Sequence, residues 1–403
     1  MIRVPSRSLR LLVAGLTVAV AGAACGTPTK KGSAEGKVET TTTTIAKGPD
    51  TTAAQLRSKL TGLLQEHVYL AAATTGATVA GRADEGSAAA AALDGNSDAL
   101  IDNFTAIFGK DTGAKFGELW KKHIGYVGAY AQGSASAVND LAQYAKDFGV
   151  FINSILPSLP ADAVTALVVT HEQTLKAVID AQKARNQNEA YGDLRVAAGH
   201  MSMVGAGLSG AIAKQSPDKV GGDPASKASD LVTTLNTLLR EHVYLVSAAT
   251  GATVAGRADE AAAAKAALDA NSDALTGAIA TVYGNDAGAQ FAPLWKQHID
   301  FLMSYASAVA AKDQAKADEA MDNLLNYTAD FGAFINAASP KLTKDAVAGL
   351  VKTHVFTLKD EIDAQAAKNF TKAYASERTA ADHMAMIATA LATTVVAQFP
   401  AKF

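Results

Sequence analysis

The pattern of apolar positions along this chain predicts helices. Around His67, apolar residues recur three, four and seven positions away, which places them on one face of an α-helix. No stretch alternates apolar and polar residues with a period of two, so we expect no sheet. Glycine and proline breakers divide the first half into six segments. The expected helices span roughly 52–82, 87–108, 113–132, 134–155, 161–185 and 188–213.

The same pattern occurs twice in the chain. The block TGATVAGRADE stands unchanged at 75–85 and at 250–260. With an offset of 175 residues, 58–131 and 233–306 are identical at 43 of 74 positions by direct count. After an insertion of eight residues in the second copy, the offset becomes 183. The sequence is therefore an internal duplication, and each copy should form the same helical unit.

These observations predict an all-α fold with two homologous antiparallel helical-bundle domains of about six helices each. The first domain is expected at 51–215 and the second at 227–403. Residues 216–226, SPDKVGGDPAS, are rich in Pro, Gly and Asp and should link the two domains.

The first 24 residues are typical of an export signal. A positive segment with Arg3, Arg7 and Arg10 precedes an apolar stretch that is short for a membrane span. Gly22-Ala23-Ala24 leads into Cys25, which resembles the lipobox of bacterial lipoproteins, although Gly22 replaces the usual Leu. We expect Cys25 to carry the lipid anchor, with an ordinary secretory signal as the alternative.

Residues 25–50 should form a disordered linker, because this segment contains Lys, Gly, Ser and a run of five threonines and cannot bury a core. The sequence thus predicts an extracytoplasmic protein that is anchored to the bacterial cell membrane. Cys25 is the only cysteine, so no internal disulfide can form. A net charge of -3 argues against a nucleic-acid partner.

All eight histidines fall into matched columns of the duplication. Each is expected near the middle of its helix and on an apolar face, where an imidazole needs a partner. The midpoints of antiparallel helices share one layer, so these side chains should meet in a polar layer once per domain. The pairs are His67 with His242, His123 with His298, His171 with His354, and His200 with His383.

Two further residue types complete the predicted site. Met203 follows His200 by three residues and should share its face, as Met386 does with His383. A thioether beside imidazoles suits copper, and haem iron with His and Met ligands is the alternative. Asp147 and its counterpart Asp330 should be secondary ligands or orient an imidazole.

The unchanged block raises a separate question. Gly76 and Gly81 each weaken a helix by roughly 1 kcal/mol relative to Ala, which suggests close approach of another backbone or of a flat ligand. Tight helix packing is the simpler explanation. Arg82 and Arg257, near the ends of these helices, could bond the last carbonyls, pair with a carboxylate or face an anionic ligand.

The motifs EHVYL, LWK-HI, DFG-FI and HM-M resemble tandem helical-repeat domains of secreted bacterial proteins and lipoproteins. Some of these carry the label copper amine oxidase. That enzyme builds a quinone from the Tyr of Asn-Tyr-Asp/Glu, and here Asn326-Tyr327-Thr328 lacks the acidic residue. The resemblance therefore implies the repeat architecture and no amine oxidation.

Three functions remain open at this point. The first is a lipid-anchored protein that binds a metal ion, copper in particular, with one His-rich site per domain. The second is a haem-binding bundle, and the third is a cell-envelope scaffold whose histidines are structural. No acid–base pair, phosphate loop or Cys nucleophile stands out, so metal handling or storage is favoured over catalysis.

Overall fold

The computed structural model describes residues 48–403, which belong to one compact unit. Twelve helices and no strand are present within these residues, which confirms the predicted all-α fold. The first six are α1 (Thr52–Val79), α2 (Ala83–Phe108), α3 (Lys110–Ala131), α4 (Ala137–Ile155), α5 (Ala161–Lys183) and α6 (Gln187–Gln215). The second six are α7 (Lys227–Val254), α8 (Ala258–Tyr283), α9 (Asn285–Ala311), α10 (Gln314–Ala338), α11 (Lys344–Ala366) and α12 (Phe370–Gln398). The predicted signal segment and Cys25 lie outside the described residues.

The helix boundaries follow from local signals. Thr51 caps α1 by accepting a hydrogen bond from the Ala54 N–H through its hydroxyl. Gly109, at φ +89°, separates α2 from α3 in a backbone conformation that side chains rarely adopt. Pro160 precedes the first residue of α5, where its fixed φ suits a helix start.

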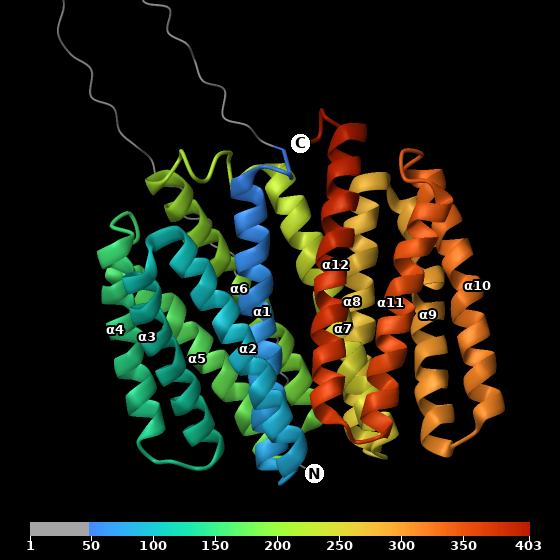
Figure 1. The fold of residues 1–403 in the computed structure, drawn as a ribbon, viewed down its shortest axis with the longest axis horizontal. Helices are drawn as coiled ribbons and strands as arrows, with labels where there is room; N and C mark the ends of the chain where they lie inside the picture. The colour runs from blue at the N-terminus through green and yellow to red at the C-terminus, as the bar shows by residue number, and fades with distance from the viewer. Residues whose placement is uncertain (1–47) are drawn as a thin grey trace, which may run out of the picture. The chain divides into compact units, whose positions relative to one another are not determined.

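Each half is arranged around one central helix. In the first half, α1 packs against α2, α3, α5 and α6, and in the second half α7 packs against α8, α9, α11 and α12 (Figure 1). Every residue from 60 to 72 of α1 is buried, whichever way its side chain points. A helix that is enclosed on all sides must find partners for its polar side chains within the protein.

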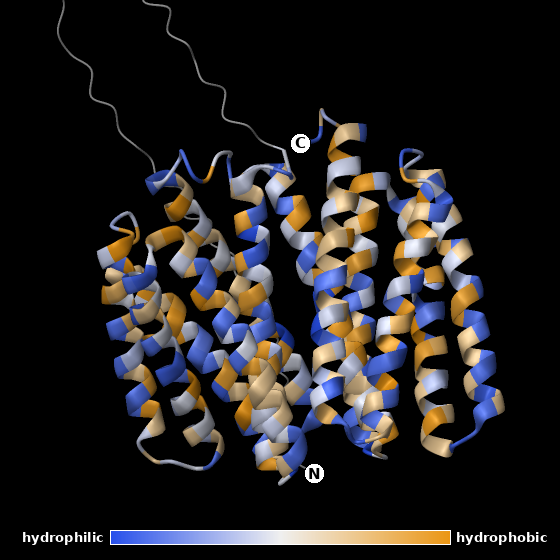
Figure 2. Cartoon of the chain, viewed as in Figure 1, coloured by the Kyte–Doolittle hydropathy of each residue, from blue (hydrophilic) through white to orange (hydrophobic). Residues whose placement is uncertain are grey.

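The two halves pack against each other through these central helices. The contact between α1 and α7 is flanked by α6 against α8 and by α2 against α12 (Figure 1). Each helix carries polar and apolar residues interspersed along its length, as expected for helices that bury one face and expose the other (Figure 2). By length and composition α6 and α12 could cross a membrane, but α6 packs on α1 and α5 as a core helix, and α12 packs on α7 and α11 in the same way.

Residues 216–226 connect α6 to α7 and also cover the start of α1. The Ala53 N–H donates to the Gly221 carbonyl, and Arg57 donates to the Pro224 carbonyl at 2.7 Å. Gly222 has φ +112°, and a Cβ there would collide with the Thr51 side chain. The connection is thus bonded to the first half along its length.

Candidate metal centre

Three histidines from three helices converge in the core of the first half. His67 comes from α1, His123 from α3 and His171 from α5, and all three are buried. One ring nitrogen of each lies within 4.8 Å of those of the other two. The Nε2 atoms of His67 and His123 are 3.2 Å apart. This group of three is called the first triad below.

The second half repeats the arrangement with His242 of α7, His298 of α9 and His354 of α11, here called the second triad. The Nε2 atoms of His242 and His298 are 3.3 Å apart. The ring centroid of His242 lies 5.8 Å from that of His354, against 5.7 Å for the corresponding pair in the first half. The second half thus repeats the three helices and the closest histidine pair, while among the described residues only the first triad brings ring nitrogens of all three histidines within 4.8 Å of one another.

The distances suit a metal ion. A tetrahedral metal with bonds of about 2.0–2.1 Å to imidazole nitrogens holds two of these nitrogens roughly 3.3–3.4 Å apart. The closest nitrogens in the two triads, at 3.2 and 3.3 Å, already have this spacing. Two Nε2 atoms that face each other need either a shared proton or a shared ion.

Aromatic rings close the sites against water. Trp120 of α3 lies 4.7 Å from the ring centroid of His67, and Tyr144 of α4 stacks on His123 at 4.9 Å. Trp295 and Tyr327 repeat these contacts in the second half. An apolar cavity of about 40 Å³ adjoins the first triad. That volume is enough for an ion or a water molecule.

Burial keeps the imidazoles neutral. Desolvation first, and a neighbouring histidine second, lower the pKa of His123 to about 3 and that of His171 to about 4. The pKa of His67 is held well below its ordinary value by the same two causes in the same order. In the second half, desolvation lowers the pKa of His298 to about 3. Neutral imidazole is the form that binds metals.

Several ring nitrogens in the triads have no hydrogen-bond partner. Among the described residues these include Nδ1 of His67 and of His242, and both ring nitrogens of His354. Buried polar atoms in native proteins are nearly always paired, so an unpartnered set at one place indicates a missing group. An ion held by the Nε2 atoms that meet in the triads would leave Nδ1 of His67 and of His242 on the far side of their rings, so among these atoms only the nitrogens of His354 are candidates to bind it.

The fourth histidine of each half does not join its triad. His200 and His383 are buried as predicted, but each hydrogen-bonds a backbone carbonyl of the preceding helix at 2.9 Å. The acceptors are Leu167 and Leu350. Each is therefore held by a backbone carbonyl through Nε2 outside its triad, and Nδ1 of His200 has no partner.

The prediction that Met203 and Met386 face the site was wrong. They are 57% and 60% exposed, while Met201 is buried against the core. Because residues advance 100° along a helix, Met203 lies about 160° from Met201. The buried face of α6 runs through Met201, with His200 at its edge. The prediction failed because it places His200 at the centre of that face.

The structure also places Asp147 and Asp330 away from the triads. Both are exposed, and Asp147 accepts a hydrogen bond from Gln143 on its own helix. Tyr144, three residues earlier on α4, turns inward and stacks on His123 instead. The sequence reading missed Tyr144 and Trp120 as walls of the site, although Trp120 shares a helix face with His123 in the LWK-HI motif.

No protein-family model matches the sequence, and no similar curated protein or solved structure was found.

Proposed function

We propose that this protein binds copper at the two buried triads and serves in metal handling or storage. One observation carries the proposal: in the first half three neutral imidazoles from three helices bring ring nitrogens within 4.8 Å of one another, and the second half repeats their closest pair at 3.3 Å. Duplication of the arrangement predicts two ions per chain.

The chemistry of the surroundings favours Cu(I) over a divalent ion. The proposed ligands are all neutral, and the walls nearest to the imidazole rings are aromatic. Burying charge in such a place is costly, and the cost rises steeply with the charge of the ion. Cu(I) brings a single positive charge and accepts imidazole ligands. The distant methionines do not contribute to this argument.

Haem and a purely structural role are weaker alternatives. The cavity beside the first triad has room for an ion and not for a porphyrin ring. A structural role would leave ring nitrogens of the second triad without partners, which is unfavourable in a core. We further propose extracytoplasmic, membrane-anchored placement through Cys25, on the sequence of residues 1–25 alone.

Elemental analysis tests the metal proposal. Residues 48–403, purified without a His tag, are loaded with Cu(I), desalted and analysed for bound metal. We expect two copper ions per chain in the wild type and one in each of the single variants His67→Gln and His242→Gln. The double variant should retain none.

The control is His200→Gln, which alters a buried histidine outside the triad and should still retain two ions. Circular dichroism confirms that each variant is folded. Equal copper in the wild type and the double variant would overturn the proposal, as would a wild type that retains no copper. A zinc-loaded sample that outcompetes Cu(I) would keep the site and change the metal.

A further inference from the structure

A second cavity lies between the two halves, away from both triads. It has a volume of about 660 Å³ and is lined by residues of α1, α2, α5 and α6 from one half and of α7, α8, α11 and α12 from the other. This is the size of a pocket for a small organic molecule. The block TGATVAGRADE, unchanged in both copies, contributes to its walls from each half.

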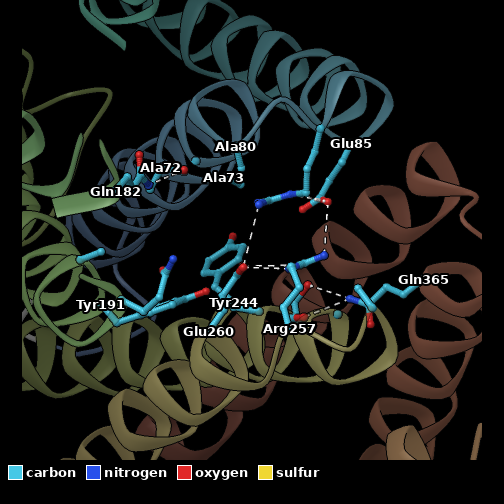
Figure 3. Close-up of a pocket in the computed structure, with 18 of the residues that line it drawn as sticks. Ala72, Ala73, Ala80, Glu85, Gln182, Tyr191, Tyr244, Arg257, Glu260 and Gln365 are labelled. Atoms are coloured by element: carbon cyan, nitrogen blue, oxygen red, sulfur yellow. Dashed lines mark hydrogen bonds and ion pairs between the residues drawn. The ribbon is translucent and has the colours of Figure 1, made fainter. Parts of the chain in front are cut away.

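Matched residues form most of the walls. Tyr69 and Tyr244 stack with their ring centroids 4.8 Å apart where the halves meet. Arg257 pairs with Glu260 of its own half and reaches Glu85 of the other half at 3.6 Å (Figure 3). Arg82 repeats these contacts with Glu85 and Glu260. These two matched arginines are thus paired with carboxylates of both halves.

The two ends of the cavity differ in chemistry. Val178 and Leu194 line it on the side of the first half. Their counterparts in the second half, at an offset of 183, are Glu361 and Glu377. Ser247 likewise replaces Ala72 at an offset of 175. At these three matched positions the first copy therefore carries apolar side chains, whereas the second copy carries two carboxyl groups and a hydroxyl group.

These three polar residues form one cluster, here called the acidic end. Ser247 lies beside both carboxyl groups and accepts a hydrogen bond from Gln365 at 3.4 Å, and Gln365 also donates to Glu361 at 3.2 Å. Glu361 and Glu377 are almost fully buried, and one oxygen of each has no partner. Glu377 lines the cavity. The unpartnered oxygen of Glu377 at the end of the cavity is an acceptor without a donor, and Glu361 stands behind it in the same cluster.

The energetics indicate what is missing. Burial first, and the other carboxyl second, raise the pKa of Glu377 well above its ordinary value. Burial also raises the pKa of Glu361. An arriving cation would stabilise the ionised carboxylates and supply the absent hydrogen-bond donors. Tyrosine rings near such a site favour a cation further through their π faces.

We propose that the cavity between the halves binds a small organic cation, with its ammonium group at the acidic end and its apolar body toward Val178 and Leu194. The acidic end would bind the positively charged group of the ligand, and Val178 and Leu194 would contact its apolar part. A metal ion alone would leave most of the 660 Å³ cavity unfilled. This site is independent of copper, because it shares no residue with the triads.

Calorimetry with phenethylammonium and benzyltrimethylammonium tests the proposal, with neutral 2-phenylethanol as the matched compound. The critical variant is Ser247→Ala/Glu361→Val/Glu377→Leu. It installs the residues that the first copy already carries at the same three places, so the fold should tolerate it. We expect at least one ammonium compound to bind and its affinity to fall by about tenfold or more in this variant.

Glu172→Val is the control, since it replaces a buried glutamate outside the cavity by its counterpart Val355 and should leave binding unchanged. The His67→Gln/His242→Gln protein should also bind the ammonium compound, which separates this site from the copper site. Equal binding of 2-phenylethanol would overturn the proposal. So would unchanged affinity in the triple variant, or no binding of either ammonium compound.

Discussion

At the scale of single residues, burial and a partner decide what each histidine does. All eight histidines are buried, yet six lie in triads and two are bonded to a backbone carbonyl. The columns of the duplication and the apolar neighbours predicted the burial. They could not separate His200 from His171, because the Leu167 carbonyl that satisfies His200 belongs to another helix.

The neutral triads make the stability of the metal-free protein depend on pH. Histidines with a lowered folded pKa bind fewer protons folded than unfolded, so the free energy of unfolding falls as pH drops below about 6.5. Each such histidine contributes up to about 1.4 kcal/mol per pH unit. Urea unfolding between pH 7.5 and 5.5, in the presence of a chelator, measures the slope.

His123→Gln/His298→Gln is the informative comparison, because glutamine does not titrate. The free energy of unfolding of this variant should change less steeply with pH than that of the wild type. The difference is the contribution of the two replaced histidines. The raised pKa values of Glu361 and Glu377 act in the opposite direction in both proteins, so they cancel in the comparison. Identical slopes would show that these two histidines are not held neutral by the fold.

At the scale of helices, the sequence predicted each element but not which face it buries most deeply. The predicted segments of the first half agree with α1 to α6 to within a few residues. The central position of α1 and α7 is not visible in their sequences, since both carry Glu and His among apolar residues. The structure encloses these polar residues and pairs Glu66 with Asn96 at 2.8 Å.

Close packing of α6 on α1 yields a prediction at this scale. A Cβ on Gly205 would collide with the Thr61 side chain and approach its Cα to 3.1 Å, whereas Gly207 on the same helix has open space around it. Gly205→Ala should lower the free energy of unfolding by about 1–3 kcal/mol through overpacking. Gly207→Ala should raise it by roughly 0.5–1 kcal/mol, because Ala is the better helix former.

Denaturant midpoints of the two variants measure this difference. They carry the same substitution two residues apart on one helix, so helix propensity cancels between them. If both variants gain stability equally, the contact between Gly205 and Thr61 is looser than the structure indicates. If both lose stability, α6 tolerates no added methyl group on either face.

At the scale of the whole molecule, two reciprocal ion pairs join the halves. Arg195 of the first half pairs with Glu241 of the second at 2.8 Å, and Arg378 of the second half pairs with Glu66 of the first at 2.7 Å. Arg195 and Arg378 occupy matched positions at an offset of 183. The sequence does not reveal their partners, because the duplication cannot tell a contact within a copy from one between copies. Each glutamate thus bridges the two halves.

This reciprocity predicts the behaviour of one half alone. Residues 48–226 would expose the α1 face that packs on α7 and would leave buried Glu66 without Arg378. A second copy of the same half offers Arg195 at the equivalent place, so two copies can rebuild both ion pairs around a two-fold axis. We expect this fragment to be a homodimer, measurable by size-exclusion chromatography with light scattering.

Breaking the exchanged pair should break the dimer. Glu66→Ala in the fragment leaves two half-buried arginines unpaired, and the cost should stay below the about 3–5 kcal/mol of breaking a fully buried ion pair. The fragment should then dissociate or aggregate, whereas Lys122→Ala, which removes an exposed ion pair with Glu118, should leave the dimer intact. A stable, fully helical monomer of 48–226 would show that each half folds without the other. The contact between α1 and α7 would then serve to form the cavity between the halves and would add little to folding.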